Sequence, residues 1–430
     1  MNFKLTSEEK KWVLYDIGNS AFVLMVSTLI PIFFNTLSQN GGLSEDDYLA
    51  FWGYAASAAT LIIAVAGPIL GAVSDRRGRK KPLFALMVLI GIVGCTILGF
   101  IESWLLFLIA FIITKAGYSG SLIFYDSMLP DITDNDRMDN VSAQGYAWGY
   151  IGSCAPFLVC LGLYISSQFD AVADFFGMSA AQYGKITTIL SFVITAVWWL
   201  LCTLPLYRSY HQKHYVDDSR WQNDLKRLGH TIVDIAKDKR VLLFVVAFFF
   251  YIDGVYTIID MATAYGTALG FDTIGLLIAL LVTQIVGFPA AIVFGRLSKR
   301  VSSVLLLSIC IAAYFGIAVF AMLMNQQIHF WILAVIVGLF QGGIQALSRS
   351  YFAKIIPPEK SGEYFGLLDI CGKGASFLGT MTVSVVTQIT NNGSLGVGAI
   401  AIFFIIGLVF FLYSVKLQKA GGANKNANNR

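Results

Sequence analysis

Charged residues are scarce in this sequence: Asp, Glu, Lys and Arg make up only 13% of its 430 residues. A soluble domain usually carries about twice that fraction. A soluble protein with an unusually apolar core would need its hydrophobic residues in runs of about 10–14. The uncharged runs here reach about 20 residues or more, as at 83–101 and 302–324. With 57% hydrophobic residues and a mean hydropathy of +0.70, the sequence predicts an all-α membrane protein.

Cysteine and histidine are too few and too scattered to build a disulfide framework or a metal site. The six cysteines lie within apolar runs without any Cys-x-x-Cys pair, and His211 and His214 have no further ligands beside them. The segment 366–374 is not a phosphate-binding loop, because its glycine-to-lysine spacing is one residue too long. No residue that could act as a nucleophile stands in a recognisable motif with a general base. We therefore expect no enzyme, no cofactor and no metal, and the net charge of +4 indicates no nucleic-acid partner.

Twelve apolar runs are long enough to cross a bilayer, which requires about 20 residues for each helix. An even number of spans places both termini on one side. All Lys and Arg residues except Lys115, Lys185 and Lys373 fall in the termini or at even-numbered connections, so the positive-inside rule places the termini in the cytoplasm. Chain length and the lack of a targeting segment suit a bacterial inner membrane. The predicted spans are 12–37, 47–72, 83–101, 104–128, 141–167, 184–206, 241–268, 272–296, 302–324, 328–351, 361–390 and 395–416.

The longest polar interruption, at 207–240, predicts a cytoplasmic linker between two halves. Its apolar residues recur at spacings of four and three, which indicates an amphipathic helix, with a solvated tether as the alternative. They are Trp221, Leu225, Leu228, Ile232 and Ile235. We expect one six-helix bundle over 1–206, a second over 241–416, and a disordered tail over 417–430.

The two halves look like an internal repeat. The pattern Gly71-x-x-Ser-Asp-Arg after the second span recurs as Gly295-x-x-Ser-Lys-Arg after the eighth. Asp126 in the first half and Arg349 in the second are separated by nearly the same number of residues as these two patterns, so we regard them as equivalent positions. These matches predict two duplicated six-helix units related by an axis along the membrane normal.

Charges inside a bilayer are costly and usually face a cavity or a partner. Spans 3, 6, 9 and 12 contain none in their interiors. For Lys115, Asp253 and Asp260 we favour substrate or coupling-ion roles, with a structural ion pair between the bundles as the alternative. Asp369 and Lys373 are four residues apart, which favours a self-neutralised pair over a substrate site. The full candidate substrate or coupling-ion group is Asp16, Asn19, Lys115, Tyr118, Asp253, Tyr256, Asp260, Gln341, Gln345, Asp369 and Lys373.

A basic turn at 71–83 joins the second and third spans. Its sequence Gly-Ala-Val-Ser-Asp-Arg-Arg-Gly-Arg-Lys-Lys-Pro-Leu resembles the signature loop between helices 2 and 3 of the major facilitator superfamily. An ordinary basic loop that only anchors topology is the alternative. Three further stretches resemble one branch of that superfamily, the vacuole effluxer (autophagy-related) transporters and their bacterial relatives. These stretches are 12–22, 124–131 and 338–350.

The resemblance implies a cytoplasmic gate. In the superfamily the second Arg of the loop engages an acid at the inner end of helix 4, which suggests Arg79 with Asp126. The loop's Asp faces the start of helix 11, which suggests Asp75 near residue 361. Because the second half has lysine and arginine at the equivalent positions, we expect it to lack an equivalent latch. The candidate gate residues are Gly71, Asp75, Arg76, Gly78, Arg79, Asp126 and Arg349.

The resemblance also implies a secondary transporter that works by alternating access, and the branch implies efflux of amino acids. We expect a small polar solute as substrate, an amino acid being the first choice. Proton coupling is a hypothesis that rests on Asp253 and Asp260. We further expect a monomer embedded in the lipid bilayer. Two other hypotheses stay open, a lipid or drug exporter of the same fold and a non-transporting membrane sensor.

Overall fold

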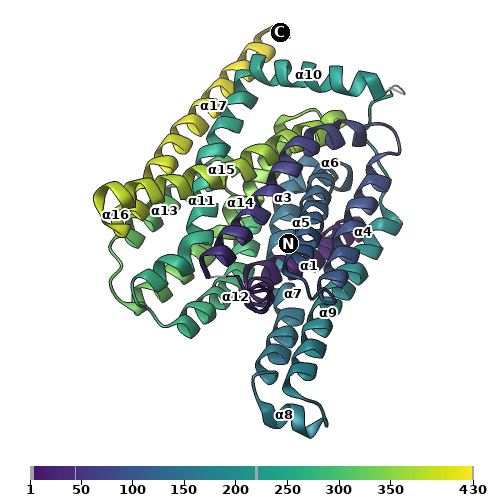
Figure 1. Cartoon of the computed structure of the whole chain (residues 1–430). Helices are drawn as coiled ribbons and strands as arrows, with labels where there is room; N and C mark the ends of the chain where they lie inside the picture. Colours follow the sequence, from purple (N-terminus) through teal and green to yellow (C-terminus); the bar gives the residue numbers. More distant parts are fainter. Residues whose placement is uncertain (1–3, 44, 218–220, 429–430) are drawn as a thin grey trace.

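The computed structural model describes residues 4–43, 45–217 and 221–428. Each predicted span corresponds to one long helix or to two consecutive helices (Figure 1). The amino-terminal half contains α1 (Ser7–Ser27), α2 (Leu29–Asn40), α3 (Glu45–Ser74), α4 (Lys80–Leu98), α5 (Trp104–Ser127), α6 (Leu129–Ile132), α7 (Asn135–Ser166), α8 (Asp170–Phe175) and α9 (Ala180–Ser209). Then follow α10 (Trp221–Lys237), α11 (Lys239–Ala268), α12 (Thr273–Leu297), α13 (Ser303–Met322), α14 (Gln327–Ile355), η1 (Pro358–Lys360), α15 (Ser361–Thr390), α16 (Gly393–Ala399) and α17 (Ala401–Asn428).

Two local features differ from the sequence prediction. The first span is broken at Thr28 into α1 and α2, because the ring of Pro31 crowds the preceding turn of a continuous helix. The tail predicted to be disordered is instead helical as far as Asn428. α17 continues past the end of the predicted span although the Gly and Asn residues of this tail are weak helix formers.

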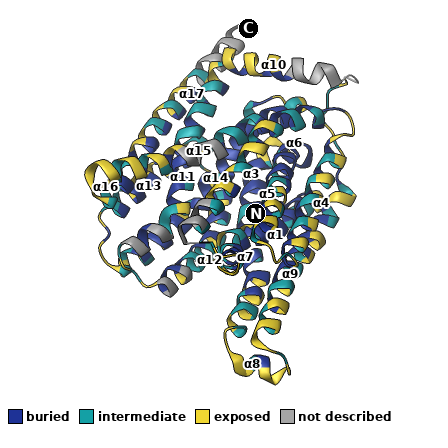
Figure 2. Cartoon of the chain, viewed as in Figure 1, coloured by how far each residue is buried: buried dark blue, intermediate teal, exposed yellow. Residues whose placement is uncertain are grey.

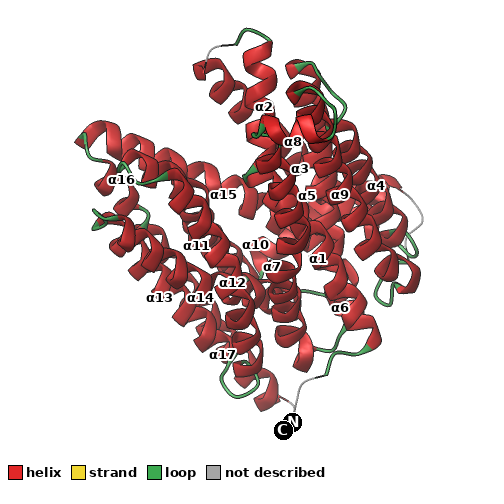
Figure 3. Cartoon of the chain, turned by 90° about the horizontal axis from the view of Figure 1, so that it is seen from below, coloured by secondary structure: helices red, strands yellow, loops and turns green. Residues whose placement is uncertain are grey.

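The molecule has two opposite ends. Figure 3 shows both termini at one end, which we call the terminal face, and α2, α8 and α16 at the other, which we call the distal face. Eleven helices of the described chain are long and apolar enough to cross a membrane. The one predicted span not among these is the eleventh, α15, a helix of 30 residues whose side chains at 373–377 are not described. The chain is therefore a multi-pass membrane protein of two six-helix groups.

Apolar residues also cover the outside of the molecule, as a lipid solvent requires. On α4 the exposed residues recur at helical spacing as Leu86, Leu89, Val93 and Ile97. On α17, Ile402, Ile405, Val409 and Leu412 do the same. Figure 2 shows these exposed faces turned away from the buried centre of each group. The charge-free third and twelfth spans therefore lie on the periphery.

The two halves meet mainly along two pairs of helices, α3 with α15 and α7 with α12. In the first pair the backbones cross closely: a Cβ atom on Gly71 would lie 2.2 Å from the carbonyl oxygen of Gly362. A Cβ atom on Gly366 would lie 2.8 Å from the carbonyl oxygen of Gly67. Glycine is required here because only hydrogen in place of a side chain leaves room. Both crossings lie toward the terminal face.

Candidate functional site

Arg349 on α14 reaches across to the amino-terminal half near the terminal face. Its Nη1 lies 3.1 Å from Oδ1 of Asp126 on α5 and 3.6 Å from Oδ2 of Asp16 on α1. Its Nε and Nη2 donate to the hydroxyl and carbonyl oxygens of Ser142 on α7 at 2.8 and 2.9 Å. The guanidinium thus joins three helices of one half to a helix of the other.

Aromatic rings surround the same guanidinium. Its central carbon lies 4.6 Å from the ring centre of Trp12 and 4.4 Å from that of Tyr146. Tyr125 lies 5.5 Å away and stacks on Trp12. Arg349 is only 5% exposed, so its charge depends on these partners rather than on water. Arginine suits such a position because its planar group can stack and donate in several directions at once.

A second contact between the halves is built around Asp75, which follows the last residue of α3. Its two carboxylate oxygens accept from the backbone N–H groups of Gly362 and Glu363 at 2.8 and 2.9 Å. These groups belong to the first turn of α15, where a helix favours negative charge. Lys80 Nζ lies 3.5 Å from Asp75 and donates to Ser361 at 2.9 Å. The predicted proximity of Asp75 to the start of the eleventh span is confirmed.

Both members of this ion pair are fully buried. Burial raises the pKa of Asp75 to about 7, although the charge of Lys80 and the two N–H donors oppose that rise. The nearby carboxylate of Glu363 adds to it. Asp75 is therefore a clamp on α15 whose charge changes near neutral pH.

The predicted pair of Arg79 and Asp126 is wrong. Arg79 is exposed, whereas Asp126 pairs with Arg349 of the opposite half. The physical reason is distance. The basic turn follows the last residue of α3 and does not reach Asp126, whereas Arg349 projects from within α14 directly toward α5. Of the other turn residues, Arg76 is buried and bridged by backbone to Val216, and Gly78 has a φ of +70° that favours glycine.

The second half has no acid at the position equivalent to Asp75, and it contacts the first half through other residues instead. The end of α12 docks near the start of α7, where the Asn140 amide donates to the carbonyl of Gly295 at 2.6 Å. Asp139 accepts from the hydroxyl of Ser303 and pairs with Lys354 at 2.6 Å. This contact thus uses an amide and an acid on α7 instead of an acid in the loop.

The linker between the halves lies against both of them. Its first part is held by the buried carboxylate of Asp131, which accepts from the Tyr210 hydroxyl at 2.5 Å and from the His214 backbone at 2.9 Å. In α10, the buried Thr231 donates its hydroxyl to Glu363 on α15. The predicted apolar face is partly wrong: Leu228 and Ile235 are buried but Ile232 is 50% exposed, and the side chains at 221–227 lie outside the described residues.

Between the halves, on the distal side of the Arg349 cluster, lie candidate substrate residues from both of them. Lys115 on α5 is half-buried, and its charge acts on Asp260, which is exposed on α11. Tyr256, one turn before Asp260, lies within electrostatic reach of Asp260 and of Asp369 on α15. Tyr118, one turn after Lys115, in turn lies within electrostatic reach of Tyr256 in the opposite half. The structure therefore brings an acid, a base and two phenols together.

Asp253 lies apart from that group. It is fully buried between α11 and α15, where its Oδ1 accepts from the Gly379 N–H at 3.0 Å and the Thr257 hydroxyl at 3.3 Å. Its Oδ2 has no hydrogen-bond partner in the described part of the chain. The shared helix face with Asp260 was predicted, but Asp253 points into packed protein. The Lys373 side chain, grouped with these residues from sequence, lies outside the described residues.

The remaining candidate substrate residues are Asn19, Gln341 and Gln345. Asn19 is buried and donates to the Tyr15 carbonyl of its own helix at 3.2 Å. Gln345 accepts from the Tyr150 hydroxyl of the opposite half at 3.0 Å, and Gln341 is buried one turn earlier in α14. Gln345 thus adds a polar contact between the halves deeper than Arg349.

Comparison with known proteins identifies the family. Residues 6–425 match the family model described as "Vacuole effluxer Atg22 like". The chain belongs to this family. The MFS-type transporter YxiO of Bacillus subtilis is 40% identical over 415 residues, which cover 95% of both chains. Autophagy-related protein 22 of Eremothecium gossypii is 24% identical over 454 residues, covering 89% of this chain and 85% of that protein.

Solved structures show that this vacuole effluxer family member has the major facilitator fold. The human organic anion transporter MFSD10 superposes with a TM-score of 0.67 at 12% identity and covers 94% of this chain and 98% of its own. The transporter FucP in its outward conformation superposes with a TM-score of 0.68 at 14% identity, with 95% and 97% covered. The predicted superfamily and branch are confirmed, and the relatives are transporters rather than enzymes.

Several residues that close the terminal face of this effluxer-family chain were not identified from the sequence. Lys80 was one cation among five in the basic turn, and only the fold shows that it is fully buried against Ser361. Ser142 carries no signal beyond its polarity. Trp12 and Tyr125 lie in stretches that carry the family resemblance, so that resemblance was the one available indication of the aromatic surround of Arg349.

Proposed function

We propose that this protein is a secondary active transporter that moves a small polar solute by alternating access, with the terminal face in the cytoplasm of a bacterial cell. The observation that carries the proposal is the position of the intramembrane charges. Lys115 lies within electrostatic reach of Asp260 in the opposite half, and Arg349 with Asp126 closes the terminal side beneath them. Charges within a membrane protein mark substrate or ion pathways when they face its interior.

An amino acid suits this site best. Lys115 offers a cation to a substrate carboxylate, and Asp260 offers an anion to its ammonium group. Because the two groups belong to different halves, a zwitterion between them would contact both bundles at once. Tyr118 and Tyr256 supply hydroxyl groups and apolar ring faces for the rest of the solute. The family description names an effluxer, which supports export as the direction.

We place the coupling proton on Asp253. Its Oδ2 is buried without a hydrogen-bond partner in the described chain, and an unpaired buried charge is expensive, whereas a neutral carboxyl is tolerated. A movement of α15 against α11 would take Asp253 away from Gly379 and let water reach it, and hydration favours the ionised carboxylate, so this movement would release the proton. The role of Asp260 is then to bind the solute, and that of Asp253 is to bind the proton.

Flux in proteoliposomes tests this proposal. Radiolabelled amino acids are loaded inside or outside the vesicles, with and without a pH gradient. We expect gradient-driven flux with the wild type, loss of gradient dependence with Asp253→Asn, and at least a tenfold loss of flux with Asp260→Asn. Asp170→Asn, on the exposed α8, is the matched control and should behave as wild type. Gradient-driven flux that survives Asp253→Asn would rule out Asp253 as the proton site.

A further inference from the structure

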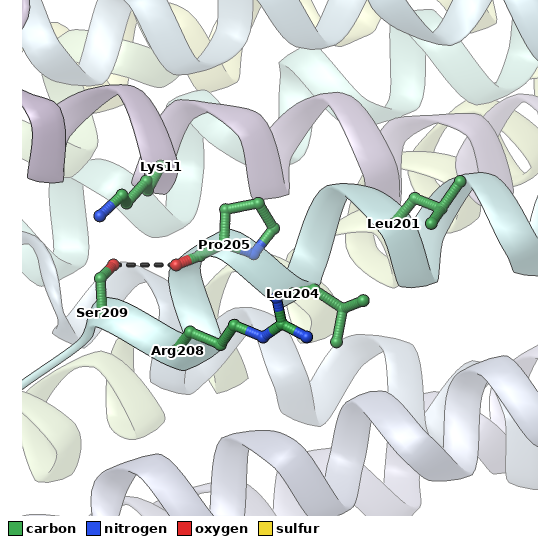
Figure 4. A pocket seen from close by; sticks show the side chains of 6 residues that line it. All are labelled: Lys11, Leu201, Leu204, Pro205, Arg208 and Ser209. Carbon is green, nitrogen blue, oxygen red and sulfur yellow. Dashed lines mark hydrogen bonds between the residues drawn. The ribbon is translucent and has the colours of Figure 1, made fainter.

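An open groove of about 520 Å³ lies on the outside of the amino-terminal half, away from the central path. Its walls come from α1 and α9, near the terminal face where α1 begins and α9 ends. Figure 4 shows Lys11 reaching from α1 toward Ser209, and Arg208 extending beside Leu204. The full lining is Lys11, Leu201, Leu204, Pro205, Arg208 and Ser209.

The two cations at this groove have no acidic partner in the described chain. Neither Lys11 nor Arg208 forms an ion pair there, because the nearby acids on α1 are already engaged. Glu8 pairs with Lys213 at 3.3 Å, and Glu9 pairs with Arg137 at 2.6 Å. The groove therefore holds two positive charges that no acidic residue of the described chain neutralises.

The polarity of the groove changes along its length. Arg208 is in the last turn of α9, and Leu201 is seven residues earlier, about 10 Å deeper at 1.5 Å per residue. Leu201 is 58% exposed, and Val197 and Leu200 continue the exposed apolar surface further along the helix. A cationic end at the membrane boundary followed by an apolar wall matches the order of phosphate and acyl chain in a phospholipid.

We propose that this groove is a binding site for an anionic phospholipid of the leaflet at the terminal face. The lipid phosphate would lie between Lys11 and Arg208, and an acyl chain would follow Leu204 and Leu201. Charge complementarity favours an anionic lipid over a zwitterionic one, because a basic pocket between membrane helices attracts acidic head groups. The open side of the groove faces the bilayer, which favours a lipid over a soluble protein.

The test compares two lipids with identical acyl chains, phosphatidylglycerol and phosphatidylcholine, on the full chain in detergent. Native mass spectrometry measures the bound fraction of each lipid over a concentration series. We expect the wild type to prefer phosphatidylglycerol, and each cation removed to weaken that preference about fivefold. The variant Lys11→Gln with Arg208→Gln should bind both lipids equally, and Lys11→Arg with Arg208→Lys should restore the preference.

The matched control is Lys10→Gln with Arg296→Gln, which removes the same two charges from exposed positions outside the groove. It should keep the wild-type preference. A single gel-filtration peak and an unchanged melting temperature in phosphatidylcholine establish that each variant is folded. Equal loss in the control, an unaltered preference in the groove variant, or displacement of the lipid by millimolar inorganic phosphate would each overturn the proposal.

Discussion

Arg349 shows how a buried charge can hold two halves together without making the contact permanent. Burying an ion pair gains little net free energy, because desolvation offsets most of the attraction. When Arg349 separates from Asp126 and Asp16 in water, all three charged groups become hydrated again. Opening of the terminal side therefore exchanges protein partners for water at modest cost. Removing one member leaves the others buried and uncompensated, which is far more costly.

We predict that Arg349→Gln lowers the stability of the protein by about 3–5 kcal/mol, as expected when one partner of a buried pair is lost. The melting temperature in detergent and flux in proteoliposomes should both fall sharply. Arg79→Gln is the control that separates the observed contact from the one predicted from sequence. Arg79 is exposed, so its removal should change stability by less than about 0.5 kcal/mol. Equal losses in both variants would contradict the contact seen here.

Asp75 gives a prediction about pH. Its pKa is raised from 3.8 to about 7 in the folded protein, so the folded state binds a proton more readily than the unfolded state between these values. The contribution of Asp75 to stability therefore falls as pH rises from about 4 to 7, by on the order of 4 kcal/mol at most. Melting temperatures of wild type and Asp75→Asn between pH 5 and 8 check this. The wild type should lose more stability with rising pH, and parallel curves would refute the assignment.

At the scale of elements, periodicity and length predicted the spans well but not how each helix is turned. Apart from the carboxyl end of α17, the spans begin and end within about six residues of their predicted limits, because hydrophobic length is fixed by the bilayer. In α10 the predicted apolar stripe included Ile232, yet the helix buries the arc between Leu228 and Thr231. At about 100° per residue, Ile232 lies about 40° outside the Leu228 edge of that arc. The polar Thr231 forms the other edge, and its burial could not be recognised without its partner on α15.

The contact between α10 and α15 should strengthen closure of the terminal face. The substitution Thr231→Val keeps the shape of the side chain but removes the hydroxyl that donates a hydrogen bond to Glu363. We predict that it destabilises the protein by about 1–3 kcal/mol. The control is Ile232→Val on the exposed side of the same helix, which should cost little. Hydrogen exchange of α10 reports the loss directly. Faster exchange in the Ile232→Val protein than in the Thr231→Val protein would be inconsistent with this docking.

At the scale of the whole molecule, the sequence shows two similar halves but not how they meet. Each half repeats its own pattern, so contacts within a half follow from spacing and family resemblance. The partner of Asp126 depends on the rotation of one bundle against the other, which no local pattern records. The same limit explains Asp253: its spacing placed it with Asp260, but packing of α15 against α11 turned it toward Gly379. Asp75 was placed correctly because the superfamily loop carries that contact between halves in its sequence.

The glycine crossing of α3 and α15 should control which side of the protein is closed. Gly71→Ala would place a Cβ atom 2.2 Å from the Gly362 carbonyl oxygen, so the two helices must separate at the terminal face. We expect the halves to open there and to approach at the distal face, with at least a tenfold loss of flux. Gly53→Ala is the matched control on the same helix, because a Cβ atom there meets nothing within 4 Å.

Spin labels at the exposed residues Phe100 and Leu323, on the distal ends of the two halves, measure this change by pulsed electron paramagnetic resonance. The distance distribution should shift to shorter values in the Gly71→Ala protein and stay unchanged in the Gly53→Ala protein. Because the halves move as packed bundles, closure at one face requires opening at the other. A Gly71→Ala protein with the wild-type distance distribution and wild-type flux would show that the crossing does not set the conformation.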